Sequence, residues 1–360
     1  MPARISSIGT ALPETSVPQQ DLRAFFADQP DVSRLTRRLI GAAFDAAGIE
    51  KRHTVLTGLG GSPDGEFIGE DATLLTPGTG TRNDLYRNAA PRLAAQAARR
   101  ALAEGEISPS QISHVVTVSC TGFFAPGLDY RLIRDLGLPE TVERSHLGFM
   151  GCAAALPGLR LASQITDSRS EAVVLVVCVE LCSLHIRDTA DAEQIVAASV
   201  FADGAAAAVV TADDAVGRSG GIMLERFTTA LTSDGESDMV WTIGDHGFNM
   251  TLSAEVPRII GREIRAAVDR FLGDAEPPST WAVHPGGRSV LDRVEAGLAL
   301  EPSALDSSRA VLREHGNMSS ATILFILRRL LEDPAVSGPI AALAFGPGLT
   351  VESALMHKSG

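Results

Sequence analysis

Three polar residues stand at predicted strand-to-helix turns of this 360-residue chain: Cys152, His284 and Asn317. Cys152 lies in "GFMGCAAALPGLRLASQI", after a glycine and at the head of a small-residue segment that an amphipathic helix follows. A thiol at the start of a helix lies over the positive end of the helix dipole, which favours the thiolate. Together the three side chains can supply a nucleophilic thiolate, an imidazolium partner and an amide hydrogen-bond donor.

Each of the three also has a structural explanation. A free cysteine is most often a small core residue. His284, in "WAVHPGGRSVLD", can be a structural strand-end histidine, and Asn317, in "EHGNMSSA", can be the N-cap of a helix from residue 320. Pro157 fits poorly in a helix that begins at Cys152, so the helix either kinks or begins later. The three residues taken together nevertheless favour chemistry, because His284 ends an apolar strand and glycines follow it.

The sequence offers little support for phosphate-binding, metal-binding or disulfide motifs. The loop "TPGTGTRND" lacks the Gly-Lys-Ser/Thr of a P-loop. The eight histidines show no zinc-protease spacing, and no carboxylate cluster predicts a metal site. No CxxC pair exists among the four cysteines, so neither a disulfide scaffold nor structural zinc is expected, and a reducing cytoplasm is the expected location. The cysteines are Cys120, Cys152, Cys178 and Cys182.

The elements that must position these residues follow an α/β pattern. Buried strands are expected at 114–120, 172–180, 204–212, 280–284 and 340–346. Amphipathic helices are expected at 91–103, 128–136, 257–272 and 320–332. This alternation predicts an α/β fold with buried sheets.

The chain contains a rough internal repeat. The polar, glycine-rich segment 212–221 is the best linker candidate, and it divides the chain into halves at 1–212 and 213–360. "GFMGCAAALPGLRLASQI" followed by "EAVVLVV" resembles "EHGNMSSATILFILRRLL" followed by "PIAALAF". We therefore expect equivalent loops of the two halves to meet near a pseudo-twofold centre.

Composition narrows the function. The chain is 45% hydrophobic with a formal net charge of −13, which argues against nucleic acid or an anionic membrane as the main partner. The longest apolar runs are strand-sized, so no membrane span is expected. The N-terminal "MPARISSIGTALPE" lacks the pattern of a signal peptide.

Five motifs resemble those of type III polyketide synthases, the chalcone synthase-like group within the thiolase fold. They are "GFMGCAAA" at Cys152, "VFADGAAAAVV" at Phe201, "HPGGRSVLD" at His284, "GNMSSATILFIL" at Asn317 and "AFGPGLTVE" at 344–352. The order matches the family, and the combination of "HPGG" with "GNMSSA" is specific to it. The resemblance implies two similar α/β halves in a layered αβαβα core, and a homodimer.

The resemblance also implies a mechanism. A Cys152 thiolate, stabilised by His284 as imidazolium, takes the acyl group of a starter acyl-CoA. His284 and Asn317 then donate hydrogen bonds to the thioester oxygen of malonyl-CoA as CO2 leaves, an oxyanion-hole function worth on the order of 3 kcal/mol per donor. The enolate extends the chain over several rounds. Phe201 is expected to gate the passage between CoA tunnel and cavity, and no metal or organic cofactor is required.

Product choice depends on the residues that the resemblance places in or beside the cavity. These are Cys120, Thr121, Ala125, Cys182, His185, Trp241, Met250 and Ser319. Trp241 stands where plant chalcone synthases have glycine, and the small Ala125 stands where they have methionine. Such exchanges resemble bacterial alkylpyrone and alkylresorcinol synthases, so we expect a fatty acyl starter and a pyrone or resorcinol product.

The CoA site departs from the plant pattern. The helix that usually presents basic residues to CoA reads "LTRRLIGAAFDAAGIEKRH", with alanines in place of some of them. The available substitutes are Arg37, Arg38, Lys51, Arg52 and Arg288. A starter delivered by an acyl carrier protein therefore stays open as an alternative to acyl-CoA.

Three other functions stay open as well. A single-step ketoacyl synthase of the same fold would stop after one condensation. A cysteine peptidase or amidase would hydrolyse amides, although the papain-type "CGSCW" is absent. A catalytically silent binding or scaffold protein would keep the fold and use Cys152 only for packing.

Overall fold

Nine strands form one twisted sheet, which two smaller two-stranded sheets and ten α-helices accompany in the part of the chain that the structure describes. The structure is a computed structural model that describes residues 2–212 and 220–359. The strands are β1 (Ala3–Ala11), β2 (Thr15–Pro18), β3 (Lys51–Thr54), β4 (His114–Ser119), β5 (Glu143–Gly148), β6 (Val173–Leu181), β7 (Asp203–Ala212), β8 (Ile222–Leu231), β9 (Met239–Gly244), β10 (Gly247–Leu252), β11 (Thr280–Val283), β12 (Gly338–Gly346) and β13 (Thr350–Lys358). The helices are α1 (Gln19–Ala27), α2 (Arg34–Ala46), α3 (Thr79–Glu104), α4 (Leu128–Leu136), α5 (Ala155–Ser168), α6 (Ala192–Val200), α7 (Val256–Leu272), α8 (Arg288–Leu298), α9 (Asp306–His315) and α10 (Thr322–Glu332).

The large sheet consists of two portions with the same plan. Its strand order is β11-β12-β13-β8-β1-β7-β6-β4-β5. In the first half β4 runs parallel to β6, and β6, β7 and β1 follow antiparallel to one another. In the second half β11 runs parallel to β12, and β12, β13 and β8 follow in the same way. The two portions join through a short β1–β8 pairing at residues 4–5 and 222–223. The internal repeat expected from the sequence is confirmed by this topology.

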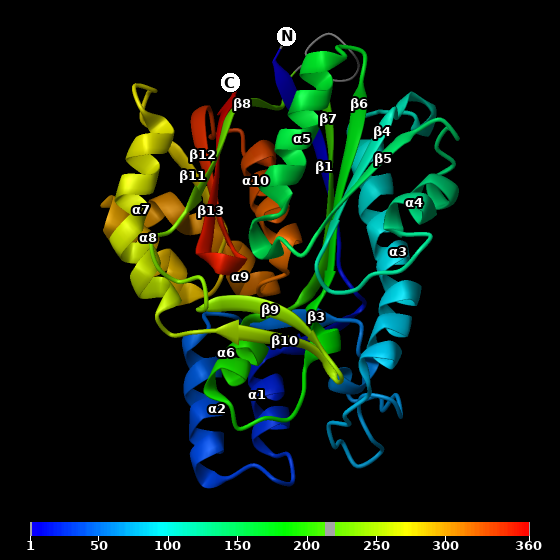
Figure 1. Cartoon of the computed structure of the whole chain (residues 1–360), viewed down its shortest axis with the longest axis vertical. Helices are drawn as coiled ribbons and strands as arrows, with labels where there is room; N and C mark the ends of the chain where they lie inside the picture. The colour runs from blue at the N-terminus through cyan, green and yellow to red at the C-terminus, as the bar shows by residue number, and fades with distance from the viewer. Residues whose placement is uncertain (1, 213–219, 360) are drawn as a thin grey trace.

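The helices and the two portions of the sheet form five layers. Figure 1 shows α3 and α4 outside the first portion, α5 and α10 between the two portions, and α7 and α8 outside the second. The strand side chains alternate between these layers: Val115 and Val177 face the α3 side, whereas Val116 and Val176 face α5 and α10. The αβαβα layering expected from the sequence is therefore present.

Small residues allow these layers to pack closely. Gly9 of β1 lies against the alanine-rich helix α3, where an added Cβ would be 2.3 Å from the Ala101 nitrogen and 2.3 Å from the Ala97 oxygen. No side chain fits at such distances, so glycine is required where β1 crosses α3. The abundance of alanine and glycine in the sequence has this physical reason.

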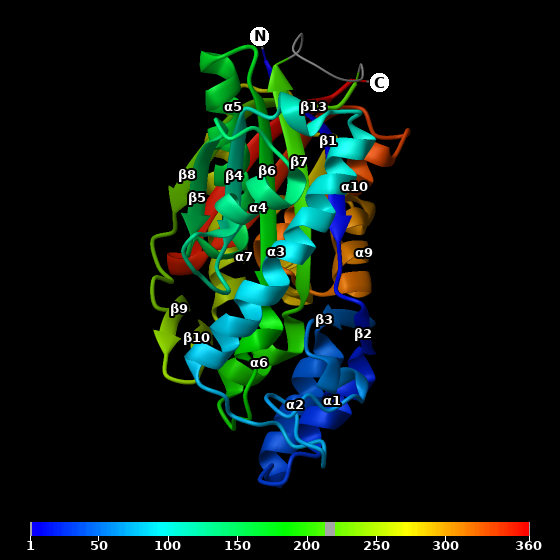
Figure 2. The same cartoon turned by 90° about the vertical axis from the view of Figure 1, so that its right-hand side faces the viewer.

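One end of the molecule is built from the segments inserted into the two halves. Helices α1, α2 and α6 and the β9–β10 hairpin gather below the sheet in Figures 1 and 2. Helix α6 contacts both α2 and β10. The cavities described below lie against these inserted segments.

The predicted strands and helices are confirmed with small shifts, except at one helix. Helix α3 begins at Thr79 rather than at 91, and Pro91 lies inside it. Of the predicted linker, residues 213–219 lie outside the described residues. None of the described helices combines the length and hydropathy that crossing a membrane requires.

Candidate active site

Two short 3-10 turns meet between the halves, Gly151–Ala153 before α5 and Ser319–Ala321 before α10. The two turns contact each other, and each also contacts the central strand of the other half, β12 or β6. Gly151 has a φ of +62°, and a Cβ there would lie 2.4 Å from Cδ of Pro347. The glycine before Cys152 is thus required by both backbone conformation and packing. Since α5 begins at Ala155, the later helix start is the correct alternative for Pro157.

Cys152 and Asn317 are in contact, although 165 residues separate them in the sequence. The Cys152 Sγ lies 3.9 Å from Oδ1 and 3.9 Å from Nδ2 of Asn317. Oδ1 accepts a hydrogen bond from the Ser319 backbone nitrogen at 2.9 Å, and Nδ2 donates to the Gly286 oxygen at 3.4 Å. Asn317 therefore does not cap α10, whose N-cap is Ala321. Its amide instead lies beside the thiol.

His284 lines the same cavity as Cys152 and Asn317. It follows β11, and its backbone nitrogen donates to the Leu343 oxygen at 2.8 Å. The residue is only 1% exposed, yet neither Nδ1 nor Nε2 has a hydrogen-bond partner among the described residues. Buried ring nitrogens normally have partners. The unpaired nitrogens of His284 are thus available to a ligand or to a transferred proton.

Burial favours the neutral forms of both groups. Desolvation raises the pKa of the Cys152 thiol to about 11, although the hydrogen bonds with Ser319 and Asn317 act in the opposite direction. Desolvation also lowers the pKa of His284 to about 3. This environment favours a neutral thiol and a neutral imidazole, whereas the sequence led us to expect a resting thiolate and imidazolium.

Phe201 and Asn317 are tied together through the backbone. Their segments form an isolated parallel bridge, in which Asn317 donates to the Val200 oxygen at 2.9 Å and accepts from the Ala202 nitrogen at 2.8 Å. Arg52 is buried and donates to the Phe201 oxygen at 2.6 Å. The backbone that carries the predicted gate is therefore fixed on two sides.

Phe201 stands between two cavities. The larger cavity, of about 380 Å³, is lined by Cys152, His284, Asn317 and Phe201. The smaller pocket, of about 40 Å³, is also lined by Phe201. Four of the predicted cavity residues line this smaller pocket, namely Cys182, His185, Trp241 and Met250.

Aromatic side chains fill much of the space around the smaller pocket. The His185 and Phe248 rings stack with centroids 4.2 Å apart, and Trp241 meets both rings edge-on at 5.5 and 5.8 Å. Hydrogen bonds hold this cluster: Trp241 Nε1 donates to the Cys120 oxygen at 2.8 Å, and the Phe248 nitrogen donates to His185 Nδ1 at 3.0 Å. Phe248 was not among the predicted site residues, because no motif carries it.

The other four predicted cavity residues line neither cavity. Cys120 and Thr121 lie behind the Cys152 turn, where the Gly151 nitrogen donates to Cys120 Sγ at 3.1 Å. Ser319 contributes to the turn before α10. Ala125 is exposed and lines neither cavity, so its place beside the cavity stays a prediction.

A buried carboxyl that sequence analysis missed lies behind this turn. Glu180, on β6, is fully buried and accepts hydrogen bonds from Ser320 Oγ at 2.5 Å, the Cys120 nitrogen at 2.9 Å and Thr121 Oγ1 at 2.9 Å. Burial raises its pKa to about 7, against the effect of these donors. Only its charge inside the apolar run "AVVLVVCVE" could have revealed it.

The predicted basic residues are mostly elsewhere. Arg37, Arg38 and Lys51 are exposed and line neither cavity, and buried Arg52 donates to backbone oxygens. Since none of these four residues lines either cavity, their role in CoA binding stays a prediction. Arg288 does line the larger cavity, together with two arginines that the sequence did not single out, Arg258 and Arg293.

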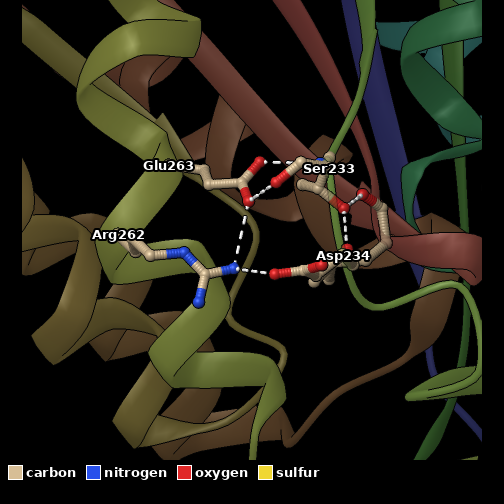
Figure 3. A network of polar contacts seen from close by, with 6 residues as sticks. Ser233, Asp234, Arg262 and Glu263 are labelled. Carbon is tan, nitrogen blue, oxygen red and sulfur yellow. Dashed lines mark hydrogen bonds and ion pairs between the residues drawn. The ribbon is translucent and has the colours of Figure 1, made fainter.

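A polar network fixes the loop after β8 to α7, near this cavity (Figure 3). Ser233 donates to Glu263 from its backbone nitrogen at 3.0 Å and from its hydroxyl at 2.6 Å. Arg262 contacts Asp234 at 2.7 Å and Glu263 at 3.1 Å. The loop leads into β9, whose first residue, Met239, lines the larger cavity.

Comparison with known proteins decides the family. The profile for the N-terminal domain of chalcone and stilbene synthases matches residues 1–214, and the profile for their C-terminal domain matches residues 226–359. The chain belongs to the chalcone and stilbene synthase family. This type III polyketide synthase is 34% identical over 386 residues to bisdemethoxycurcumin synthase of Oryza sativa subsp. japonica, covering 99% of this chain and 92% of the relative.

Another relative is much longer. The chain is 30% identical over 367 residues to probable polyketide synthase 1 of Dictyostelium discoideum, covering 98% of this chain but spanning only 11% of that relative's length.

Solved structures support the thiolase fold that the sequence predicts. PKS-I of the brown alga Ectocarpus siliculosus superposes with a TM-score of 0.90 at 28% identity, covering 99% of this chain and 98% of that one. The C-terminal type III polyketide synthase domain of Steely1, a type I/III hybrid from Dictyostelium, superposes with a TM-score of 0.91 at 29% identity over 100% of both chains. The enzyme is therefore a condensing acyltransferase of polyketide biosynthesis.

Proposed function

We propose that this polyketide synthase loads the acyl group of a starter acyl-CoA on Cys152 and extends it with malonyl-CoA. The observation that supports this proposal most is the shared cavity: one space of about 380 Å³ is lined by Cys152, His284, Asn317 and Phe201. A thiol, an unpaired imidazole and an amide that line one cavity are the groups that thioester exchange and decarboxylation need. The proposed route uses CoA thioesters and no cofactor.

Loading begins from neutral groups. Burial keeps the Cys152 thiol protonated, and the ring nitrogens of His284 have no hydrogen-bond partner among the described residues. Cys152 Sγ therefore attacks the thioester carbon while a ring nitrogen of His284 accepts the thiol proton. The carbon–sulfur bond to CoA breaks, the CoA thiolate takes the proton from His284, and the acyl group stays on Cys152. His284 returns to its neutral form, ready for malonyl-CoA.

Extension uses the same residues as donors. The Asn317 amide and a protonated nitrogen of neutral His284 donate hydrogen bonds to the thioester oxygen of malonyl-CoA. The bond to the carboxylate breaks, CO2 leaves, and the electron pair of that bond forms the enolate. The enolate attacks the acyl carbon on Cys152, the acyl–sulfur bond breaks, the Cys152 thiolate is released, and the lengthened chain stays on the CoA of the extender until the thiolate takes it again. The apolar ring of Phe201 borders both cavities and disfavours the ionised malonyl carboxylate there.

Two combinations of starter and product are candidates for this enzyme. The resemblance of the sequence favours a fatty acyl starter and a pyrone or resorcinol product. A short starter with few extensions is favoured by the pocket beyond Phe201, since about 40 Å³ holds roughly three water molecules. Trp241 and the stacked His185 and Phe248 occupy the volume that a long chain would need.

A homodimer is part of the proposal. Strand β5 lies at the edge of the large sheet, and five of its six residues are exposed. The nearby Phe123 and Phe149 are 50% and 39% exposed. An exposed edge strand beside exposed aromatic side chains suits association with a second copy.

The test is mass spectrometry of products from purified protein with malonyl-CoA and starters from acetyl-CoA to palmitoyl-CoA, and with Cys152→Ala as control. Triketides or tetraketides that depend on Cys152 support the polyketide synthase, and the best starter separates the two candidates. Products of one condensation support a ketoacyl synthase, and release of amines from amide substrates supports an amidase.

Inactivity with every CoA thioester makes an acyl carrier protein the donor to test next. Inactivity with both donors, together with a Cys152 that iodoacetamide alkylates no faster than Cys178, supports a silent binding protein. Cys178 is the matched control because it is fully buried in the sheet.

A further inference from the structure

Three arginines line the larger cavity from α7 and α8. Arg258 lies in the first turn of α7, and Arg288 and Arg293 lie on α8. All three line the cavity that also contains Cys152. From α2, which carries the expected Arg37 and Arg38, the lining residues are instead Ala43 and Ala46.

The three cations are exposed and not firmly neutralised. Arg288 lies 3.7 Å from Asp292, a loose ion pair in which the Arg288 side chain is 60% exposed. Arg258 contacts Glu255 at 2.5 Å, but its side chain is still 68% exposed. Arg293 has no ion-pair partner within residues 2–212 and 220–359. Exposed ion pairs of this kind are weak, so an anionic ligand can compete for the arginines.

Other arginines of α7 are placed differently. Arg262 is engaged with Asp234 and Glu263 in the network of Figure 3, and it does not line the cavity. Arg265 is exposed and also lies outside the cavity lining. The network fixes the loop after β8 against α7 and thereby holds the helix that carries Arg258.

We propose that Arg258, Arg288 and Arg293 bind the phosphate groups of the pantetheine thioester donor, so that α7 and α8 take the role expected of α2. This inference rests on the proposed function. Arginine suits the task because its guanidinium forms two parallel hydrogen bonds with phosphate oxygens. In a chain with a net charge of −13, a local group of cations is also needed to attract a polyanion such as CoA.

The test compares matched charge removals. The triple variant Arg258→Gln, Arg288→Gln, Arg293→Gln should weaken the calorimetric affinity for CoA by at least about 100-fold, with about tenfold for each single change. The control Arg265→Gln removes one charge from α7 away from the cavity and should change the affinity less than twofold. The α2 variant Arg37→Gln, Arg38→Gln should also change it less than twofold.

Substrates without phosphate separate phosphate binding from structural damage. The KM for malonyl-CoA should rise in the triple variant with little change in kcat, whereas both constants for malonyl-pantetheine should stay at wild-type values. A carrier-protein thioester distinguishes the source: a rise in KM for it as well indicates that the shared pantetheine phosphate is recognised, and a rise for CoA alone indicates the additional phosphates of CoA.

Several results would overturn the proposal. They are unchanged CoA affinity in the triple variant, greater sensitivity of the α2 variant, or equal losses with malonyl-pantetheine. CoA affinity is measured without turnover, so the arginine proposal can stand if no polyketide forms. Conversely, polyketide formation with unchanged CoA affinity in the triple variant would refute the arginines and leave the proposed function intact.

Discussion

Cys152 and Ser320 occupy equivalent places in the two halves of the molecule. Each follows a residue with positive φ, +62° at Gly151 and +48° at Ser319, and each lies in a 3-10 turn that leads into a central helix. The turns also contact the opposite half in the same way, one on β12 and the other on β6. The backbone of the repeat is thus nearly the same around the two side chains.

The two turns differ in the strand of the other half that each one contacts. Strand β6 places Glu180 under the second turn, and the Ser320 hydroxyl donates to it at 2.5 Å. Ala282 pairs with Ala342 as Val118 pairs with Cys178, and this places Ala344 of β12 at the position that corresponds to Glu180. One half therefore holds its turn with a buried hydrogen bond, whereas the other has no carboxyl there and leaves Cys152 free for a ligand.

The largest effect on activity is expected when Cys152 itself is replaced. Cys152→Ala should abolish starter loading and lower product formation by at least about 10³-fold, because no other described thiol lines the larger cavity. Intact-protein mass spectrometry with acyl-CoA measures the acylated fraction.

Ser320→Ala is the matched control in the other half. It should still load the starter, but its free energy of unfolding should fall by about 1–3 kcal/mol, because Glu180 loses a buried donor. Acylation of another residue in Cys152→Ala would contradict the assignment of the nucleophile.

The second effect concerns the residues three positions before Cys152 and Ser320. Phe149 in the first half corresponds to Asn317 in the second, since each precedes the methionine that caps its turn. Asn317→Ala should slow malonyl-CoA decarboxylation by about 10²–10³-fold, the usual cost of losing one oxyanion donor, and slow loading much less. Rates of CO2 release and of acyl transfer are measured separately.

Phe149→Ala serves as the control because Phe149 is 39% exposed and its ring lies against Phe123 and Phe248. Decarboxylation should stay within a few-fold of wild type in this variant. Equal losses of loading and decarboxylation in Asn317→Ala would rule out the proposed division of roles.

The third effect is on stability and depends on pH. Burial raises the pKa of Glu180 from 4.5 to about 7, so the folded state binds this proton more tightly than the unfolded state. The contribution of Glu180 to stability is therefore fully present below pH 4.5 and is lost as pH rises through 7, by about 3 kcal/mol. Thermal unfolding between pH 5 and pH 8 measures this loss.

Glu180→Gln makes position 180 uncharged, as Ala344 is in the other half. The difference in unfolding free energy between wild type and Glu180→Gln should shift in favour of the variant as pH rises. Parallel pH profiles for the two proteins would show that Glu180 does not titrate in this range.

The smallest effect concerns the insertions in which the halves differ. The first half inserts α1 and α2 before its outer helix α3, whereas the second inserts the β9–β10 hairpin before α7. Trp241→Gly on this hairpin should enlarge the smaller pocket and shift the products to longer starters or more extensions, with total turnover within a few-fold. Trp241→Phe keeps most of the bulk and removes the hydrogen bond to Cys120, so it should keep the wild-type products. Chromatography with mass detection measures the profile, and the same products from Trp241→Gly would place Trp241 in the core alone.

Local patterns were sufficient to predict much of the central fold. Continuous apolar runs predicted β4, β6, β7, β11 and β12 because these strands are buried on both faces. Strands such as β8 were missed, since "IMLERFTTAL" mixes charged and apolar residues along a partly exposed strand. Helix α3 was begun too late because proline usually marks a first turn, whereas Pro91 lies inside this helix.

The residues of the site were predictable where a motif carries them. Cys152, His284 and Asn317 could be singled out from their turns, and the structure brings them to one cavity. Arg258 and Arg293 could not, because the direction in which α7 and α8 present a side chain depends on packing between halves. The sign of the Cys152 pKa shift was missed for a similar reason: the extent of burial is a tertiary property.

The backbone bridge between Phe201 and Asn317 has a consequence for altering this enzyme. Phe201, the proposed gate, and Asn317, the proposed donor to the reacting oxygen, share one pair of hydrogen-bonded segments. Exchanging the side chain of Phe201 leaves this pairing in place, so substrate range can change while the amide keeps its position. An insertion or proline beside Phe201 moves both at once, so selectivity and rate then decline together.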